Sequence, residues 1–184
     1  MTPIQLLPVG ETDPSLLDFL ALGLSAEFCV QCQALKARFD PEPSFNLERQ
    51  QYFSTDLLER MQKRFAPKSF RLLGVTALDL YIPILTFVFG EAHLNGPCAL
   101  VSTCRLRQEF YGLPPQPELL RERLVKEAVH ELGHTLGLTH CDDYRCAMSP
   151  SHAVERIDLK SGNLCARCRT LSASRLSSRR AGGD

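Results

Sequence analysis

The stretch HELGHTLGLTH, residues 130–140, constrains this chain more than any other part of it. It contains three of the five histidines in 184 residues, at offsets of four and six positions. At the composition of this chain, the five fixed positions of the pattern H-E-x-x-H-x-x-G-x-x-H would arise by chance with odds on the order of 10⁻⁵. Histidines scattered along a surface helix would show no such order, so we interpret the stretch as a metal site.

A long helix is predicted to carry the first two histidines. Pro117 can open this helix near Glu118, and the pattern continues to Leu136. Apolar residues at four-residue steps would form one buried face: Leu120, Leu124, Ala128, Leu132 and Leu136. His130 and His134 lie roughly 160–200° around the helix from that face. One side of the helix is therefore expected to enter the core, while the other presents the histidines to a cleft.

Three imidazoles in this stretch can hold one ion. His130 and His134 are one helical turn apart, which places their Cβ atoms about 5–6 Å from each other. Gly137 can take the left-handed conformation that ends a helix, so the chain can turn and deliver His140 as the third ligand. Three nitrogen ligands leave a fourth tetrahedral position open for water, which indicates a catalytic rather than a structural zinc.

Glu131 is the candidate catalytic residue. It follows the first ligand directly, where its carboxylate can reach water at the open position of the metal. Zinc lowers the pKa of such water toward about 7, and the glutamate can take the proton as general base and pass it to a leaving amine. The predicted reaction is therefore hydrolysis of an amide bond.

Met148 adds a resemblance to a known clan. HELGHTLGLTH, followed eight residues later by this methionine in CAMSP, resembles the metzincin clan of zinc metallopeptidases. By that resemblance, Met148 forms the Met-turn, a tight loop beneath the metal that supports the histidines without binding the ion.

Four cysteines near the histidines form a second candidate site. They occur as two pairs, in CDDYRC and CARC: Cys141, Cys146, Cys165 and Cys168. Such pairs suit a closed, structural zinc held by four thiolates, and reduced free thiols or two disulfides are the alternatives. Because Cys141 adjoins His140 and Cys146 precedes Met148 by two residues, this zinc would fix the loop beside the first site. Two zinc ions are expected in total.

The combined pattern HExxHxxGxxHC, CxM and CxxC is similar to the archaemetzincin family. The stretch LDLYIPILTFVFGEAHLNGPCALVSTCRLR also resembles that family, and the resemblance extends to about Thr170. It implies an α/β (α+β) fold with a mixed twisted sheet, a long active-site helix, a Met-turn and a small zinc-stapled C-terminal subdomain. It also implies that Cys98–Leu106 is the edge strand over the cleft, where a substrate peptide would add antiparallel. Cys98 and Cys104 depart from the apolar residues expected in that strand.

The chain as a whole is predicted to alternate strands and helices, which favours a mixed sheet carrying helices on one side. The predicted strands are Ile4–Val9, Phe28–Leu35, Phe70–Thr76, Thr86–Phe89 and Cys98–Leu106. A helix is expected to open near Asp13–Pro14, and an amphipathic helix is expected over Ser54–Phe65. Phe39–Gln51, with two prolines, is predicted to be a loop.

The length suits one domain. Residues 1–170 are expected to form a single metzincin-like catalytic domain, with an N-terminal subdomain to about 137 and a C-terminal subdomain at about 138–170. The segment 171–184 is rich in serine and arginine, has no apolar period, and is predicted to be disordered.

The remaining cysteines and histidines are not expected to bind metal. Cys29 and Cys32 would point to opposite faces of a strand, and Cys98 and Cys104 would be about 20 Å apart along one. Solvated or structural positions are expected for four polar residues near the predicted cleft: Asp79, Tyr81, His93 and His152.

Composition limits the partners. The net charge of zero and the lack of a basic face argue against nucleic acid. No apolar run approaches 18 residues, so no membrane association is expected. The apolar N-terminus lacks a basic n-region and is interrupted by acidic residues, so a cytoplasmic protein with reduced thiols is predicted. We expect a monomer that acts on a peptide or protein substrate.

Two other classes of function compete with the peptidase. One is a catalytically silent, zinc-stabilised peptide-binding protein, and the other is a four-cysteine nucleic-acid-binding module. The presence of Glu131 favours the enzyme, because a purely structural site does not need that carboxylate.

Overall fold

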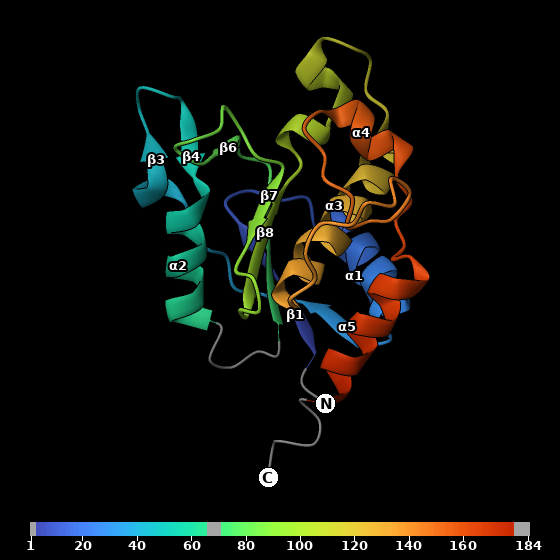
Figure 1. Ribbon diagram of the computed structural model, residues 1–184. Helices are drawn as coiled ribbons and strands as arrows, with labels where there is room; N and C mark the ends of the chain where they lie inside the picture. Colours follow the sequence, from blue (N-terminus) through green and yellow to red (C-terminus); the bar gives the residue numbers. More distant parts are fainter. Residues whose placement is uncertain (1–2, 66–70, 179–184) are drawn as a thin grey trace.

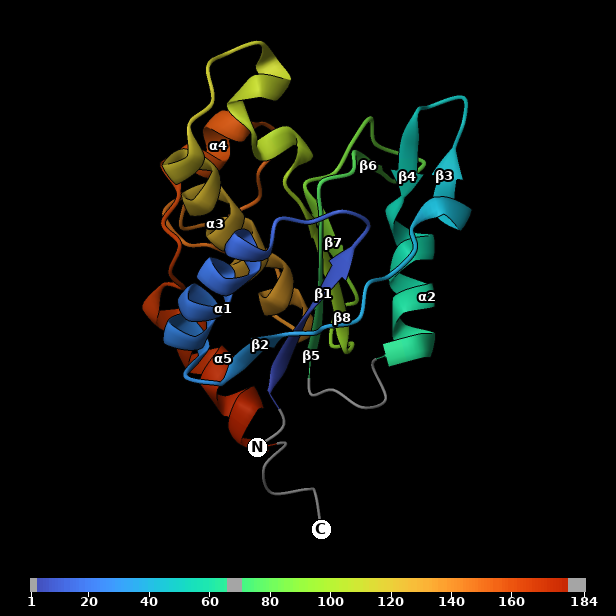
Figure 2. The same ribbon diagram turned by 180° about the vertical axis from the view of Figure 1, so that it is seen from behind.

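A five-stranded mixed sheet runs through the middle of the molecule, with helices on both of its faces (Figures 1 and 2). The computed structural model describes residues 3–65 and 71–178. The strand order is β2–β1–β5–β8–β7. Their bounds are β1 Ile4–Val9, β2 Cys32–Ala34, β5 Arg71–Thr76, β7 Gly90–Ala92 and β8 Cys98–Ser102. Neighbouring strands are parallel, except that β7 runs antiparallel to β8.

A small second sheet lies beside the main one (Figure 1). It contains β3 Phe45–Asn46, β4 Gln51–Phe53 and β6 Leu80–Tyr81, in the order β3–β4–β6. Short 3₁₀ segments cover Glu42–Ser44, Cys104–Leu106 and Gln108–Tyr111. The segment predicted as a loop, Phe39–Gln51, thus includes a short strand, and β4 begins at its last residue.

Five α-helices occur in the described residues, and they divide between the two faces of the main sheet. They are α1 Pro14–Phe28, α2 Ser54–Phe65, α3 Pro117–Thr135, α4 Val154–Leu159 and α5 Ala166–Ser178. Helix α2 packs through Leu57, Leu58 and Met61 on one face, while α1 and α3 cover the other. The prediction that helices lie on one side of the sheet is therefore wrong.

The central strands are buried on both sides, because helices cover both faces. In β5, Leu72 belongs to the core under α2 and its neighbour Leu73 to the core under α1 and α3. Leu100 and Val101 of β8 divide in the same way. Strands buried on two faces have continuous apolar sequences rather than alternating ones.

The predicted starts of the helices are confirmed. The Asp13 side chain accepts a hydrogen bond of 2.9 Å from the backbone N–H of Ser15, and Pro14 occupies the first position of α1. Helix α3 begins at Pro117 and continues to Thr135, within two residues of the predicted ends. The α/β (α+β) fold with a mixed sheet and a long helix is also confirmed.

The predicted edge strand is wrong. Strand β8 lies inside the sheet, between β5 and β7, and β7 forms the edge. After β7 the chain reverses tightly: the backbone N–H of His93 donates to Cys98, and Asn95 adopts φ +60°. This turn adds one more strand beyond the segment that was expected to be the edge.

Three predicted strands have different bounds. Phe28 ends α1, because Cys29 takes a left-handed conformation with φ 51°, and the following strand is only Cys32–Ala34. Within Thr86–Phe89, only Val88 makes a bridge, and regular pairing starts at Gly90. The strand from Cys98 stops at Ser102, where a 3₁₀ turn follows. Phe70 lies outside the described residues.

The predicted disordered tail is partly helical. Helix α5 extends to Ser178, and Ser172 is buried against the rest of the molecule. Leu176 packs against the main core and Arg175 donates to Asn95, so tertiary contacts hold a helix that the sequence pattern does not suggest. Residues 179–184 lie outside the described part of the chain.

Candidate metal centre

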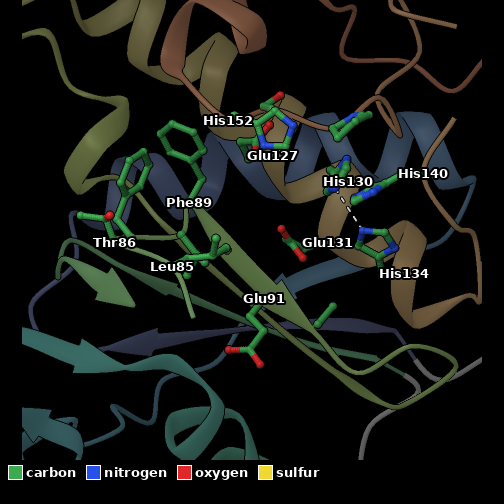
Figure 3. A pocket seen from close by; sticks show the side chains of 16 residues that line it. Leu85, Thr86, Phe89, Glu91, Glu127, His130, Glu131, His134, His140 and His152 are labelled. Carbon is green, nitrogen blue, oxygen red and sulfur yellow. Dashed lines mark hydrogen bonds between the residues drawn. The ribbon is translucent and has the colours of Figure 1, made fainter. Parts of the chain in front are cut away.

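Three histidine rings converge at the end of α3 (Figure 3). The Nε2 atoms of His130 and His134 are 3.0 Å apart, and a ring nitrogen of His140 joins them so that all three lie within 4.8 Å of one another. Ring centroids are 4.6–5.2 Å apart. The structure therefore brings together the three residues predicted to bind the first ion.

Backbone carbonyl groups fix the protonation of two of these rings. His130 donates from Nδ1 to the oxygen of Ala147, and His134 donates from Nδ1 to the oxygen of Leu138, both at 2.8 Å. Burial lowers the pKa of both histidines, which favours the neutral rings. Two neutral rings with Nδ1 protonated direct Nε2 lone pairs toward each other at 3.0 Å. A cation between them relieves this repulsion, so the donor set fits a metal such as zinc.

Gly137 turns the chain so that His140 can reach the other two rings. It has φ +78°, its N–H donates to His134, and the N–H of Leu138 donates to Gly133. This pair of hydrogen bonds is the Schellman arrangement that ends many helices. The positive φ favours glycine at position 137, and a Cβ atom there would also have to displace the ends of the Asn95 and Arg175 side chains.

Met148 lies beneath the helix that carries the histidines. It is fully buried, and its sulfur touches Gly133 so closely that a Cβ atom there would overlap it. The carbonyl of Met148 accepts a hydrogen bond of 3.0 Å from the N–H of Cys141, the residue after His140. A tight loop with a buried methionine thus supports both the helix and the residue that follows His140.

The histidines open into a cleft of about 490 Å³. Its walls come from the chain before and within β7, from α3, and from the segment after Met148; they include Leu85, Phe87, Phe89, Gly90, Glu127, Glu131 and His152. Glu131 is buried beside His130, and burial, then the charge of Glu127, raises its pKa well above the usual value. The predicted catalytic carboxylate therefore faces the histidines across a small volume (Figure 3).

Glu91 also lines the cleft, but α2 holds its carboxylate. The hydroxyl groups of Ser54 and Thr55, at the start of α2, donate to its two oxygens. In Figure 3 the Glu91 carboxylate points away from the histidines. Of the two carboxylates, Glu131 is therefore the better placed to act beside the three histidines.

Four cysteines converge next to the histidine cluster. The sulfur atoms of Cys141, Cys146, Cys165 and Cys168 all lie within 4.8 Å of one another. The Cys141 and Cys165 sulfurs are 3.9 Å apart and no disulfide joins them. Four thiols at this separation fit a tetrahedral zinc site and do not fit two disulfides.

The other residues considered in the sequence analysis agree only in part with their expected positions. His152 is exposed, as expected, but it also lines the cleft. Asp79 does not line the cleft. Its carboxylate instead forms a bidentate ion pair with Arg105, at 2.6 and 2.7 Å. Cys98 is buried in the sheet, and the exposed Cys29 lies at a helix end rather than in a strand.

Two residues of the cleft were missed by the sequence analysis. Glu127 lies one turn before Glu131 on α3, and the same four-residue spacing could have indicated it. No sequence pattern indicated that Gly90 lines the cleft, because the approach of β7 to α3 depends on packing between residues far apart in the chain.

Residues 26–173 match the sequence model of peptidase family M54. An archaemetzincin of Methanocaldococcus jannaschii is 42% identical over 165 residues, which cover 90% of this chain and 89% of that protein. The chain belongs to the archaemetzincin family, peptidase family M54. An archaemetzincin of Pyrococcus abyssi is 36% identical over 91% of this chain and 93% of its own length.

Solved structures of archaemetzincins share the fold. The archaemetzincin of Methanopyrus kandleri superimposes with a TM-score of 0.80 at 37% identity, over 95% of this chain and 96% of that one. A zinc-dependent peptidase of Methanocorpusculum labreanum gives 0.82 at 31% identity, over 92% and 99%. The mixed α/β fold class and the resemblance to archaemetzincins are both confirmed.

Proposed function

We propose that this archaemetzincin hydrolyses peptide bonds with zinc held by His130, His134 and His140 and with Glu131 as general base. The observation that carries the proposal is the convergence of three histidine nitrogens within 4.8 Å beside a buried glutamate in an open cleft. Membership of a peptidase family supports the same reaction.

The chain's own groups have defined tasks in this reaction. Zinc, when bound, supplies Lewis acidity that acidifies water and polarises a carbonyl group. Glu131 removes the proton from the attacking water and later donates it to the nitrogen of the leaving amine. The carbonyl groups of Ala147 and Leu138 keep the two helical ligands in the right orientation.

Strand β7 offers a surface on which a peptide could bind. It is an edge strand of the main sheet, and Gly90 and Glu91 line the cleft. An extended peptide can pair with such an edge through backbone hydrogen bonds. Pairing there would lay the peptide across the cleft between β7 and α3, next to Glu131.

We propose that the four cysteines hold a second, structural zinc. Their four thiolates would complete a closed tetrahedral site, with no position left for substrate. Cys141 follows His140, and Cys146 accepts from the N–H of Cys165, so this site connects the third histidine to α5. Reduced thiols of this kind favour a cytoplasmic location. Every proposed ligand comes from one chain, so a monomer suffices.

No helix in the described part of the chain has the length and apolar character needed to cross a membrane.

A catalytically silent peptide-binding protein is the alternative, and the variant Glu131→Gln separates the two. If the proposal is right, E131Q keeps its zinc and loses peptide cleavage by a factor of about 10³ or more. Glu122→Gln, at an exposed position on the same helix, is the matched control and should cleave normally. Cleavage by E131Q at the wild-type rate would show that Glu131 is not the base, and a wild type that binds but never cleaves peptides would favour the silent protein.

A further inference from the structure

A lysine is buried behind the wall of the cleft, and the proposed reaction gives it no task. Lys160, at the end of α4, has a side chain only 1% exposed. Its ammonium nitrogen lies 2.7 Å from Oε1 of Glu127, which lines the cleft from α3 and is also almost completely buried. Burying a charged pair is costly, so its position needs a reason beyond stability.

Lys160 also binds the main chain next to the Met-turn. Its ammonium group donates a hydrogen bond of 3.2 Å to the carbonyl oxygen of Ser149. Ser149 comes directly after Met148, and the next three residues, Pro150, Ser151 and His152, form one wall of the cleft. One cation thus joins the helix that carries the metal ligands to the wall that faces them.

One ammonium group contacts both partners. Oε1 of Glu127 lies 2.7 Å from the Lys160 nitrogen, and the carbonyl oxygen of Ser149 accepts a hydrogen bond of 3.2 Å from it. Lys160 therefore connects α3 to the residue that follows Met148. Burial raises the pKa of the Glu127 carboxyl, and the charge of Lys160 lowers it.

We propose that Lys160 is a positioning residue for the archaemetzincin cleft. By holding Ser149, it fixes the wall formed by residues 150–152 relative to Glu131 and so determines which substrate side chain fits beside the scissile bond. The inference rests on the proposed function. Lys160 contacts neither the histidines nor the cleft, so it positions the wall through its contacts with Ser149 and Glu127.

A second ion pair between the same two helices serves as a control. Arg123, one turn before Glu127 on α3, forms a bidentate ion pair with Asp158 of α4, with N–O distances of 2.6 and 2.7 Å. Arg123 is as deeply buried as Lys160, but neither member of this pair lines the cleft. Losing it should loosen α4 without moving the wall directly.

The test uses two double variants of the zinc-loaded protein. Lys160→Met with Glu127→Met removes one pair without leaving an unpaired charge, and Arg123→Met with Asp158→Met removes the other. The single variant Lys160→Met is made as well, but its unpaired carboxylate is expected to lower stability, so it is not used alone. Zinc content and melting temperature are measured for each.

Hydrogen exchange gives a readout that needs no activity. The backbone N–H of Ser149 donates to the carbonyl oxygen of Cys146, so its exchange reports on the residue that Lys160 holds. Amide exchange of Ser149 should rise about tenfold in K160M/E127M, the factor expected for one lost buried hydrogen bond, and stay at the wild-type rate in R123M/D158M. Equal exchange of Ser149 in K160M/E127M and the wild type would overturn the inference.

Ligand preference gives the second readout. The probes are peptide hydroxamates that differ in a single side chain, methyl, isobutyl or benzyl, and their dissociation constants are measured by calorimetry. Because Glu127 lines the cleft, K160M/E127M is compared with the single variant Glu127→Met, which makes the same change in the cleft and keeps Lys160. K160M/E127M should change the ratio of the affinities by about threefold or more relative to Glu127→Met, while R123M/D158M preserves the wild-type ratio. A uniform change in all three affinities would mean that Lys160 serves stability alone. Because neither readout requires turnover, failure of the proposed peptidase activity would be seen separately, in the wild type.

Discussion

The backbone of Gly90 in strand β7 lies against the carboxyl group of Glu131 in helix α3. A Cβ atom on residue 90 would be 2.7 Å from Cγ and 2.8 Å from Oε1 of Glu131, and 2.6 Å from the carbonyl oxygen of Leu100 on its other side. The edge strand can therefore approach the proposed base only because residue 90 has no side chain. Peptide bound along β7 would lie within reach of Glu131 for the same reason.

We predict that Gly90→Ala impairs the enzyme without removing its metal. The added methyl group cannot move toward the Leu100 backbone, so Glu131 must shift, and misplacement of a catalytic group by about 1 Å can cost on the order of 100-fold in rate. Steady-state cleavage of a peptide and zinc content measured on the same sample check this. Gly162→Ala is the control, because its Cβ would meet its nearest neighbour at an ordinary 3.7 Å. Wild-type activity in Gly90→Ala would show that this close approach does not matter.

We predict that Gly137→Ala lowers stability more than Gly112→Ala. Both glycines have positive φ, +78° and +73°, so each variant carries the backbone cost of about 1–2 kcal/mol for a left-handed residue. At position 112 no atom of the described residues lies within 4 Å of the new methyl group, whereas at 137 it would overlap Asn95 and Arg175. Denaturant unfolding of the two variants measures the difference, which we attribute to displacing the Asn95 and Arg175 side chains. Similar losses of stability in the two variants would mean that Asn95 and Arg175 move aside at no cost in free energy.

The sequence predicted the convergence of the three histidines because their spacing is local. His130 and His134 are one turn apart on a helix that starts at a proline, and Gly137 ends that helix, so the meeting of three rings follows from short-range rules. The four cysteines were equally predictable, because each pair is short and the first adjoins His140.

The edge of the sheet could not be predicted in the same way. Whether β8 or β7 is the outer strand depends on the turn from His93 to Gly96, which is stabilised partly by the N–H of Asn95 donating to His134, 39 positions later in the chain. Helix α5 was missed for a similar reason. Its buried contacts, through Ser172 and Leu176, are to residues distant in sequence, and they outweigh a composition typical of disorder.

We predict that the thiols outside the cysteine cluster react with alkylating reagents in an order set by burial. Burial raises the pKa of Cys98 from 9.0 to about 12 and that of Cys104 to about 11, whereas Cys29 is exposed. Only thiolates react, so at pH 8 native Cys29 should be modified first and Cys98 last. The sign of the shift also means that Cys98 stabilises the fold fully below pH 9 and progressively less as the pH rises toward 12. Mass spectrometry of iodoacetamide-treated protein gives the order, and rapid labelling of Cys98 would contradict its burial.

We predict that Cys168→Ser removes one of two zinc ions and weakens binding of the other. The Cys168 sulfur lies within 4.8 Å of the other three, so its loss opens the four-thiolate site, and loss of a structural metal commonly costs more than about 4 kcal/mol. The effect should reach the histidines, since Cys141 adjoins His140 and donates its N–H to Met148. Native mass spectrometry counts the ions, and a chelator titration compares the affinity of the remaining one with the wild type. The exposed Cys29→Ser is the matched control and should keep both ions. If Cys168→Ser also keeps two ions and melts like the wild type, the four thiols hold no metal, and their convergence reflects packing alone.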